Sequence, residues 1–446
     1  MLGQNRTTQT FLGSERRQSV AAGTVLDKRE SAIELVRPTT LAQVQDTVRR
    51  AHLTGAQVRL IDPQGSAEAA QPGVAIDLRG LRGLVSVDPA AGTATFLAGT
   101  TIDQAATQLE AEGLSMVGAP SDAKLTLGAG VVLGGHSGAP RDASFPASVA
   151  GVTLIDETGA VLRVSASRNP HFWSAARLSL GALGIVTEVT VRVRRYQALR
   201  VKRVKTDLRS MLRDLPEARS KVDYYVAAWR PGHDGVKLTL GWLEDASPAQ
   251  VAARRGNLSS ALHAQDEKAG LFRRLRAGVR RLFGGGAERL DERREGPTGS
   301  LAEGRDVAGA NSSAVTMEYQ FPLYKVDLVL QALHDIAQRN RAFSGVQARL
   351  GMVARDDVWL SPAYGQDVVA VALDVSDASG RNLEALRQAE ELFIYLGGLP
   401  NWAGWNTFTA GEAADVMPRY SDFVHIAHDL DPDAIFRNAV ADRLVH

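Results

Sequence analysis

Hydrophobic and polar residues alternate along the first half of the chain in a pattern that predicts short strands between helices. Leu41, Val44 and Val48 recur at the spacing of one helical face, after a threonine, Thr40, that can cap a helix. Residues 102–112 predict a second helix. Short apolar runs bounded by turn residues predict strands at 58–61, 74–77, 85–88, 93–97, 151–156, 161–164 and 185–193. We therefore expect an α+β structure with mixed strands in this half.

The pattern changes after Val193, where the apolar and polar residues alternate over longer stretches. Strands are predicted at 222–229, 236–242, 315–320 and 368–375, and helices near 324–338 and 381–396. Such strands are typical of an antiparallel sheet with helices on one face. We expect two domains, 1–195 and 196–415, with 416–446 packing back on the first.

A segment rich in Arg, Ala, Gly and Ser, residues 246–314, interrupts the second half. Within it, residues 271–283 place apolar side chains on one helical face with arginines around them. One interpretation is a peripheral membrane contact, through a helix attracted to anionic lipid. The other is an exposed, mobile insertion whose apolar face packs on the protein itself.

Composition narrows the classes of function. The chain has 446 residues, 44% hydrophobic and 23% charged, with a net charge of +1, so it has no general attraction for nucleic acid. It contains no cysteine, which excludes disulfides, thiolate metal sites and a cysteinyl cofactor link. No paired-histidine spacing, P-loop or Gly-x-Ser-x-Gly motif is present, and we expect no metal site. Without an apolar run of the ~18–20 residues that a membrane span needs, the protein is expected to be cytoplasmic.

The segment Thr126–Val149 is rich in glycine and small residues around one histidine, His136. Glycine lacks a Cβ, so backbone there can approach a bulky flat ligand closely. The glycine spacing is similar to a dinucleotide fingerprint, but Pro140 and Pro146 follow and are expected to prevent a helix. We therefore predict a ligand-contacting loop; a turn that merely connects two elements is the other interpretation.

Further segments occur in a characteristic order along nearly the whole chain. They are RPTT at 37–40, VSVDPAAGT at 85–93, LGALGIVTE at 180–188, DDVWLSP at 356–362 and the C-terminal segment 417–436. Together with the glycine-rich segment, they resemble the vanillyl-alcohol-oxidase type of FAD-dependent oxidoreductases, and within it the sugar-acid lactone and alditol oxidases and the decaprenylphosphoryl-ribose oxidases. The resemblance implies a two-subdomain FAD-binding domain of the PCMH type in the first half.

The resemblance also implies how FAD is held. The pyrophosphate would lie on the loop 61–67, where Asp62 adds a negative charge and Pro63 removes an N–H donor. The histidine that some relatives use for covalent attachment is absent there, so FAD is expected to bind non-covalently. The implied contacts with FAD are Gly65, Ser66, Pro120, Ser121, Thr126, Gly128, Gly130, Gly134, Gly135, His136 and Ile185.

On the substrate side, the resemblance implies that Arg349 stabilises the charge of reduced flavin or orients the substrate. Gln347 stands where some relatives have an acid, and Asn401 replaces the histidine of a Pro-His-Trp-Gly-Lys signature. The implied activity is hydride transfer from a sugar-type alcohol or lactol to flavin, with a lipid-linked sugar left open. The alternative is a flavoprotein fold without catalysis that serves as a binding or membrane-associated module.

Overall fold

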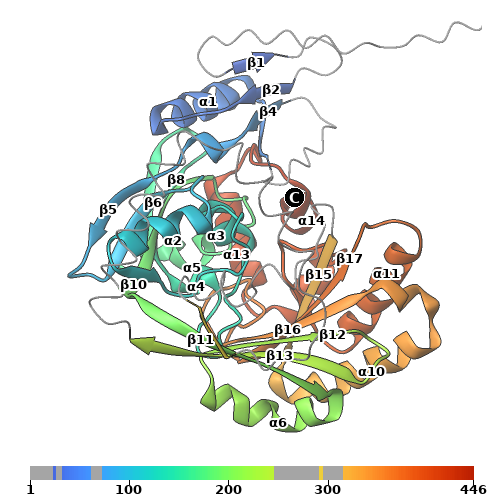
Figure 1. Ribbon diagram of the computed structural model, residues 1–446. Helices are drawn as coiled ribbons and strands as arrows, with labels where there is room; N and C mark the ends of the chain where they lie inside the picture. The colour runs from blue at the N-terminus through green and yellow to red at the C-terminus, as the bar shows by residue number, and fades with distance from the viewer. Residues whose placement is uncertain (1–23, 27–32, 62–72, 246–290, 295–314) are drawn as a thin grey trace, which may run out of the picture.

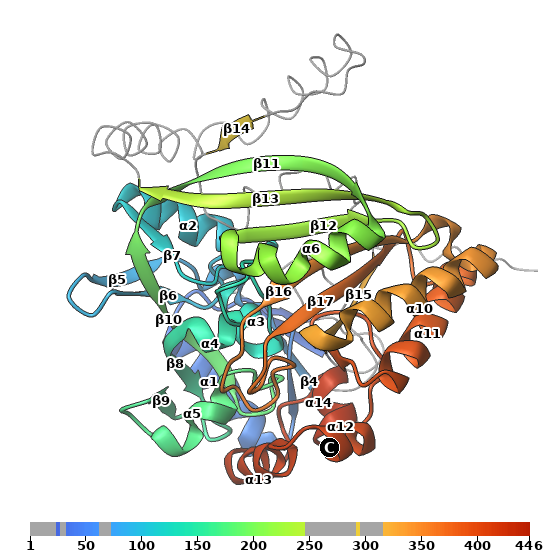
Figure 2. The ribbon, with the colours of Figure 1, turned by 90° about the horizontal axis from the view of Figure 1, so that it is seen from below.

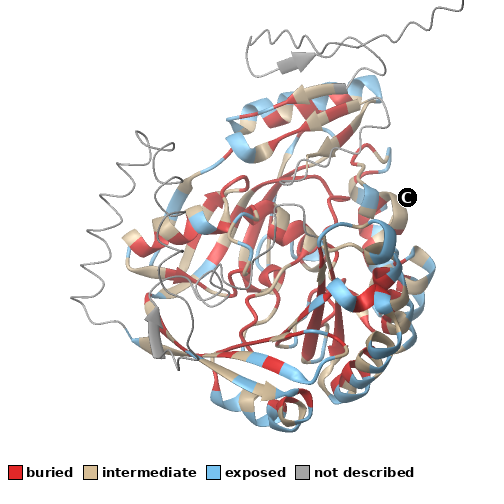
Figure 3. Ribbon diagram, turned by 45° about the vertical axis from the view of Figure 1, so that its right-hand side comes forward, coloured by how far each residue is buried: buried red, intermediate tan, exposed pale blue. Residues whose placement is uncertain are grey.

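The computed structural model describes residues 24–26, 33–61, 73–245, 291–294 and 315–446, and the structural statements below concern these residues. Three sheets of four, six and eight strands form the frame of the described chain (Figure 1). Figure 3 shows that buried residues line the strands where the sheets and helices meet. No helix among the described residues is long and apolar enough to cross a membrane. The structure is thus the mixed helix and sheet fold that the sequence predicts.

The four-stranded sheet has the order β1-β2-β4-β3 and is parallel at its centre. Its strands are β1 (Thr24–Leu26), β2 (Ile33–Val36), β3 (Gln57–Leu60) and β4 (Gly73–Ile76). Helix α1 (Leu41–Thr54) connects β2 to β3 and begins at Thr40, whose side chain accepts a hydrogen bond from the Gln43 N–H. It ends at Gly55, which has a φ of 66° that suits glycine. The predicted first helix is therefore confirmed, cap included.

The six-stranded sheet has the order β5-β6-β10-β8-β9, with a short strand β7 paired to β10. These strands are β5 (Leu84–Asp88), β6 (Thr93–Leu97), β7 (Leu114–Met116), β8 (Val149–Ile155), β9 (Val161–Ser165) and β10 (Ile185–Arg195). Helices α2 (Ile102–Ala111) and α5 (Pro170–Ala176) belong to this part of the chain. The core on this sheet contains the fully buried rings of Phe96 and Phe145.

The glycine-rich segment contains a helix, contrary to the expectation from its prolines. Helix α3 (Leu127–Leu133) begins at Thr126, whose hydroxyl accepts from the Ala129 N–H at 3.2 Å, and ends before Pro140. Pro146 lies in the first turn of helix α4 (Phe145–Ser148), where the missing N–H costs no helical bond. The prolines therefore limit the length of the helices without preventing them.

The eight-stranded sheet is antiparallel throughout its described pairs, in the order β14-β11-β13-β12-β16-β17-β15-β18. Its strands are β11 (Gln197–Asp207), β12 (Tyr224–Trp229), β13 (Gly235–Asp245), β14 (Asp291–Arg294), β15 (Val315–Pro322), β16 (Gln347–Val353), β17 (Val368–Val375) and β18 (Leu399–Pro400). Strand β14 lies within the predicted insertion 246–314 and pairs with β11. The predicted helix 271–283 lies outside the described residues.

Three helices cover one face of this sheet: α6 (Leu208–Lys221), α10 (Val326–Arg339) and α11 (Gly380–Tyr395) (Figure 2). The strands present alternate apolar residues to them, such as Tyr319 and Phe321 on β15 and Leu350 on β16. These side chains share a core with Leu330 of α10 and Phe393 of α11. The predicted antiparallel sheet with helices on one face is confirmed.

The C-terminal segment returns to the four-stranded sheet. The Val58 N–H donates to the Ile435 carbonyl at 2.7 Å, and the Arg437 N–H donates to the Val58 carbonyl at 3.0 Å. Ile435 and Phe436 are buried in the same core as Val58. The helices around this segment, α12 (Ala410–Val416), α13 (Tyr420–Leu430) and α14 (Ala439–Leu444), instead contribute to the core of the eight-stranded sheet. The segment therefore packs on both sheets, and the domain limits 1–195, 196–415 and 416–446 stay a prediction.

We expect Phe436→Ala to lower the stability of the protein markedly. The ring is 1% exposed in the core around Val58, and truncating a buried Phe typically costs ~3–5 kcal/mol. Thermal unfolding followed by circular dichroism measures the shift. Leu53→Ala is the control, because Leu53 is 77% exposed and should leave the midpoint unchanged. Equal midpoints for both variants would show that the tail does not contribute to the core.

Candidate functional site

The face of the eight-stranded sheet opposite α10 and α11 is polar and built on small residues; we call it the inner face. Alternation along the strands places on it Thr316, Glu318, Gln320, Arg349, Gly351, Ala370, Ala372 and Asp374, because their strand neighbours lie in the helix-side core. The inner face contacts the glycine-rich segment: a Cβ built on Gly351 would lie 3.5 Å from Cε1 of His136.

Strand register arranges the inner face in rows. Arg349 on β16 is opposite Ala372 on β17, and Ala372 is opposite Glu318 on β15. Neighbouring strands are ~4.8 Å apart, so the Cα atoms of Arg349 and Glu318 are roughly 10 Å apart with only a methyl side chain between them. The row thus has a cationic and an anionic residue on either side of a small floor.

Glu318 is the centre of a hydrogen-bonded cluster on the inner face. Its Oε1 accepts from Nε2 of His136 at 3.0 Å, from Nδ2 of Asn401 at 2.9 Å and from Nε2 of Gln320 at 3.1 Å. The side chains of His136 and Glu318 are only 14% and 12% exposed. These three donors converge on one carboxylate oxygen, so the cluster fixes the orientation of both Glu318 and His136.

The cluster also fixes the charge of Glu318. Burial by itself raises the pKa of the Glu318 carboxyl, but the charge and hydrogen bond of His136, with the hydrogen bonds of Asn401 and Gln320, outweigh burial and lower this pKa to about 2. The carboxylate is therefore ionised across the neutral range. It therefore stays available as an acceptor for Nε2 of His136.

Two glycines allow the glycine-rich segment to approach the inner face. Gly134 has a φ of 92°, and a Cβ built on it would lie 3.8 Å from Oδ1 of Asn401. Gly138 also has a positive φ, and its carbonyl accepts from the Tyr225 N–H at 3.3 Å. The backbone between these glycines carries His136 to Glu318.

Arg349 lies on the inner face, on the central strand β16, and its guanidinium is held by a carboxylate. It donates two hydrogen bonds to Asp374, at 2.6 Å and 3.1 Å, and Asp374 also accepts from the Thr316 hydroxyl at 2.6 Å. Gln347 precedes it on the same face and is exposed. The structure thus brings Asn401 and His136 together at Glu318, and places Arg349 at the other side of the same row.

Some of the predicted cofactor contacts lie next to His136. The Ser121 N–H donates to the His136 carbonyl at 3.3 Å, and Pro120 packs against Gly135. Gly128 and Gly130 have a packing reason of their own, because a Cβ on either would lie 3.0 Å from Ala98 or from the Phe145 ring. Ile185 begins β10 opposite Ile155. Gly65 and Ser66 lie outside the described residues, and all of these cofactor roles stay predictions.

Glu318 and Gln320 were missed in the sequence analysis. The signal was present in the segment 315–320, where Thr316, Glu318 and Gln320 alternate with Met317 and Tyr319. Polar residues at every second position of a strand indicate one face directed away from the core. The alternation could not show that this face points to His136.

The residues present fit a large flat cofactor. The inner face has small residues at Gly351, Ala370 and Ala372, and the facing loop carries Gly134 and Gly135, so backbone and small side chains line the stretch beside Arg349, Glu318 and His136. As the resemblance implies, main-chain N–H groups in the first half of the chain would bind the phosphates of FAD.

Comparisons with known proteins agree with this architecture. Residues 33–165 match the family model of an FAD binding domain, and residues 307–444 match that of D-arabinono-1,4-lactone oxidase. The chain is 25% identical to L-gulono-1,4-lactone dehydrogenase of Mycobacterium tuberculosis over 419 residues, covering 92% of this chain and 95% of the relative. It is 28% identical to alditol oxidase of a Streptomyces species over 424 residues, covering 92% and 94%.

The fold has a solved counterpart in 6-hydroxy-D-nicotine oxidase from Arthrobacter nicotinovorans, with a TM-score of 0.62, 18% identity and 93% coverage of both chains. This likeness concerns the fold. The two family models cover the FAD-binding half and the substrate-side half in the order that the sequence predicts. The chain therefore combines an FAD binding domain with a D-arabinono-1,4-lactone oxidase domain, the two parts implied by its resemblance to the vanillyl-alcohol-oxidase type of FAD-dependent oxidoreductases.

Proposed function

We propose that this protein oxidises a sugar-type alcohol or lactol, of the aldonolactone or alditol class, at the inner face. The observation that carries the proposal is the His136–Glu318 pair, a buried imidazole and carboxylate 3.0 Å apart beside a small-residue floor. The named relatives, a lactone dehydrogenase and an alditol oxidase, support the substrate class. Nothing in the comparisons supports the alternative of a fold without catalysis.

When bound, FAD supplies the hydride acceptor for the carbinol carbon of the substrate. The chain must then remove the hydroxyl proton, because a hydride leaves an alcohol carbon readily only as the oxygen loses its proton. Asn401 stands where the resemblance has a histidine and cannot accept this proton as a base. His136 is the nearby side chain of a type that exchanges protons near neutral pH.

We assign His136 as the proton acceptor and Glu318 as the group that holds it. A carboxylate bonded to Nε2 stabilises the imidazolium that forms, as in other carboxylate–histidine pairs. The lowered pKa of Glu318 argues against its being the proton acceptor itself, because an acid with a pKa of about 2 holds a proton weakly. Asn401 and Gln320 act as positioning residues, since both bond to Glu318.

Arg349 supplies positive charge from the opposite side of the same row. Its pairing with Asp374 fixes the guanidinium in place, so the charge does not have to be oriented during the reaction. We propose that it stabilises negative charge that develops next to the floor. A lipid-linked substrate, a membrane contact through residues 271–283, and a cytoplasmic location stay predictions.

The activity is tested on the purified yellow protein under anaerobic conditions. Addition of L-gulono-1,4-lactone or of an alditol should bleach the absorption of oxidised flavin, because the substrate then reduces the cofactor. Unchanged spectra with a panel of both classes would contradict the proposed substrate class. The flavin spectrum itself separates this result from a loss of cofactor.

Glu318→Gln should lower kcat/KM by at least ~10²-fold, the range in which acid–base groups contribute. The acid limb of the pH profile should also move to lower pH, because the imidazolium of His136 loses its neighbouring negative charge. Glu318 itself stays ionised above its pKa of about 2, so it adds no limb of its own between pH 4 and 9. Steady-state rates measured over that range check both effects.

The matched control is Glu188→Gln. Glu188 lies on β10, away from the inner face, and its carboxylate accepts a hydrogen bond of 2.9 Å from the Thr153 hydroxyl. It should keep the parent rate and profile. A Glu318→Gln protein with full flavin content, parent rate and an unmoved acid limb would remove Glu318 and His136 from the mechanism.

Arg349→Ala should lower kcat and kcat/KM together, by ~10²-fold, because a charge that acts mainly in the transition state is lost. Arg200→Ala is the control. Arg200 lies on β11 of the same sheet, and its Nε donates a hydrogen bond of 2.9 Å to Glu244 on β13. A parent rate in Arg349→Ala would show that the guanidinium has only a structural role.

FAD should be bound non-covalently. Its affinity should be lower than that of the same protein with a loop lacking Asp62 and Pro63. One repulsive charge and one lost donor at a diphosphate each cost on the order of 1 kcal/mol. Acid precipitation should therefore release all flavin into the supernatant, and Asp62→Gly should raise occupancy. A yellow pellet would contradict the first expectation, and unchanged occupancy the second.

A further inference from the structure

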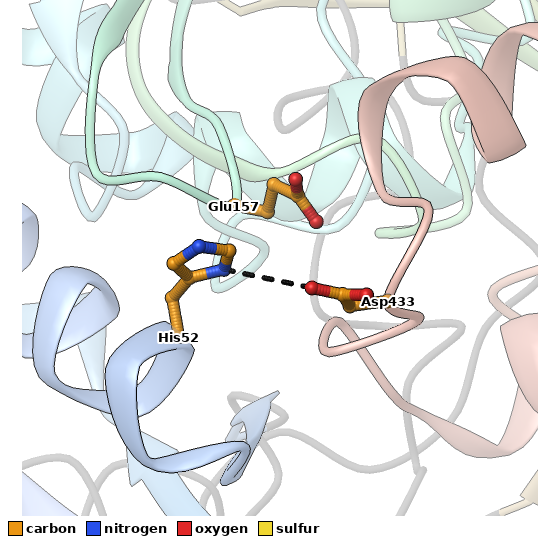
Figure 4. A group of neighbouring side chains, drawn as sticks. All are labelled: His52, Glu157 and Asp433. Carbon is orange, nitrogen blue, oxygen red and sulfur yellow. Dashed lines mark ion pairs between the residues drawn. The ribbon is translucent and has the colours of Figure 1, made fainter.

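We propose that His52, Glu157 and Asp433 form a site for a divalent cation of the zinc type, away from the inner face. One ligand atom of each residue lies within 4.8 Å of the ligand atoms of the other two. Figure 4 shows the three side chains pointing toward one another. We call these residues the α1–tail cluster.

The cluster joins three segments that are far apart in the sequence. His52 lies in the last turn of α1, Glu157 in the turn between β8 and β9, and Asp433 in the segment between α13 and α14. The last turn of a helix carries partial negative charge, which favours a cation beside it. A bound cation would therefore connect both of the smaller sheets with the C-terminal segment.

Two atoms of the cluster have unmet bonding capacity. In the part of the chain that the structure describes, Nδ1 of His52 and Oε2 of Glu157 are shielded from solvent and have no hydrogen-bond partner. The nearest oxygen of Asp433 is 4.0 Å from the His52 Nδ1, which is too long for a hydrogen bond. A buried polar atom without a partner lowers the stability of the fold, and a metal ion would accept a lone pair from both of these atoms.

The local charge favours a cation as well. Burial raises the pKa of the Glu157 carboxyl, and Asp431 and Asp433 raise it further by repulsion, against a hydrogen bond from the Asp433 N–H and the attraction of His52. The carboxylate of Asp431 is buried directly behind, held by the Ile435 and Phe436 N–H groups at 2.9 Å. Three acidic groups and one histidine thus share a small region.

The ligand types select the class of ion. One imidazole nitrogen and two carboxylate oxygens suit zinc, with water in the remaining positions. Ligand atoms about 2.0–2.2 Å from a tetrahedral zinc are about 3.3–3.6 Å apart. The ligand atoms of the cluster lie within 4.8 Å of one another, so binding requires a contraction of at most roughly 1.5 Å. Asp433, which is 68% exposed, can make most of that movement.

Such an ion would act as a clamp on the C-terminal segment. Asp433 is two residues before Ile435, whose carbonyl accepts from the Val58 N–H at the end of the four-stranded sheet. Zinc binding should therefore raise the unfolding temperature of the tail and of this sheet together. The effect concerns stability and does not depend on the chemistry at the inner face.

The test is equilibrium dialysis of the untagged full-length protein against micromolar Zn²⁺, with bound metal counted by mass spectrometry. We expect the parent to bind one Zn²⁺ per chain. His52→Gln and Glu157→Gln should each bind Zn²⁺ at least tenfold more weakly. The same two variants should lose the Zn²⁺-dependent rise in unfolding temperature. Circular dichroism and flavin content show whether each variant is folded.

His425→Gln is the matched control. Nε2 of His425 lies 3.6 Å from an oxygen of Asp429, a spacing similar to that of His52 and Asp433. Among the described residues, no third His, Asp or Glu completes a possible metal site with this pair. It should retain the bound Zn²⁺. Equal binding by the parent and His52→Gln, or no Zn²⁺ bound by the parent, would overturn the proposal. Loss of catalysis alone would bear on the inner face and leave the metal count unaffected.

Discussion

The hydrogen bond between His136 and Glu318 joins the glycine-rich segment to the inner face of the eight-stranded sheet. The two residues are 182 positions apart, so the bond exists only when both halves of the chain are folded and docked. Both side chains are nearly buried, and a carboxylate in such a place is costly unless it is paired. Asn401 and Gln320 complete that pairing, which makes the orientation of the imidazole a property of the whole fold.

A second set of contacts keeps the halves in register. The loop after β16 donates from the Ala354 N–H to the Asp142 carbonyl at 3.0 Å, and Asp356 accepts from the Ser144 hydroxyl at 2.5 Å. Arg177, which is 4% exposed, makes two hydrogen bonds to Asp357 at 2.8 Å and 3.1 Å. Removing Asp357 would leave the buried charge of Arg177 without this partner, so the pair favours one alignment of the two halves. The spacing between the inner face and the glycine-rich segment is set accordingly.

The sequence anticipated much of the scaffold from local signals. Capping at Thr40, helical spacing after it, and alternation along residues 315–320 and 368–375 all correspond to observed elements. The expectation that Pro140 and Pro146 exclude a helix was wrong, since a proline constrains only its own turn and the residue before it. Glu318 was overlooked because a glutamate in an alternating strand is usually a solvent-exposed residue, and periodicity carries no information about what faces it.

By itself, the sequence determined which residues of each strand and helix are apolar, and hence which face of the large sheet its helices cover. It also carried the resemblance to FAD-dependent oxidoreductases, because glycines and the order of short segments are local features of the chain. Only the tertiary structure decided the neighbours of the polar face: His136 against Glu318, Arg349 across Ala372, and His52 beside Glu157 and Asp433. The first and last of these sets come from packing between segments more than a hundred residues apart, and the second from strand register, neither of which is encoded as a spacing along the chain.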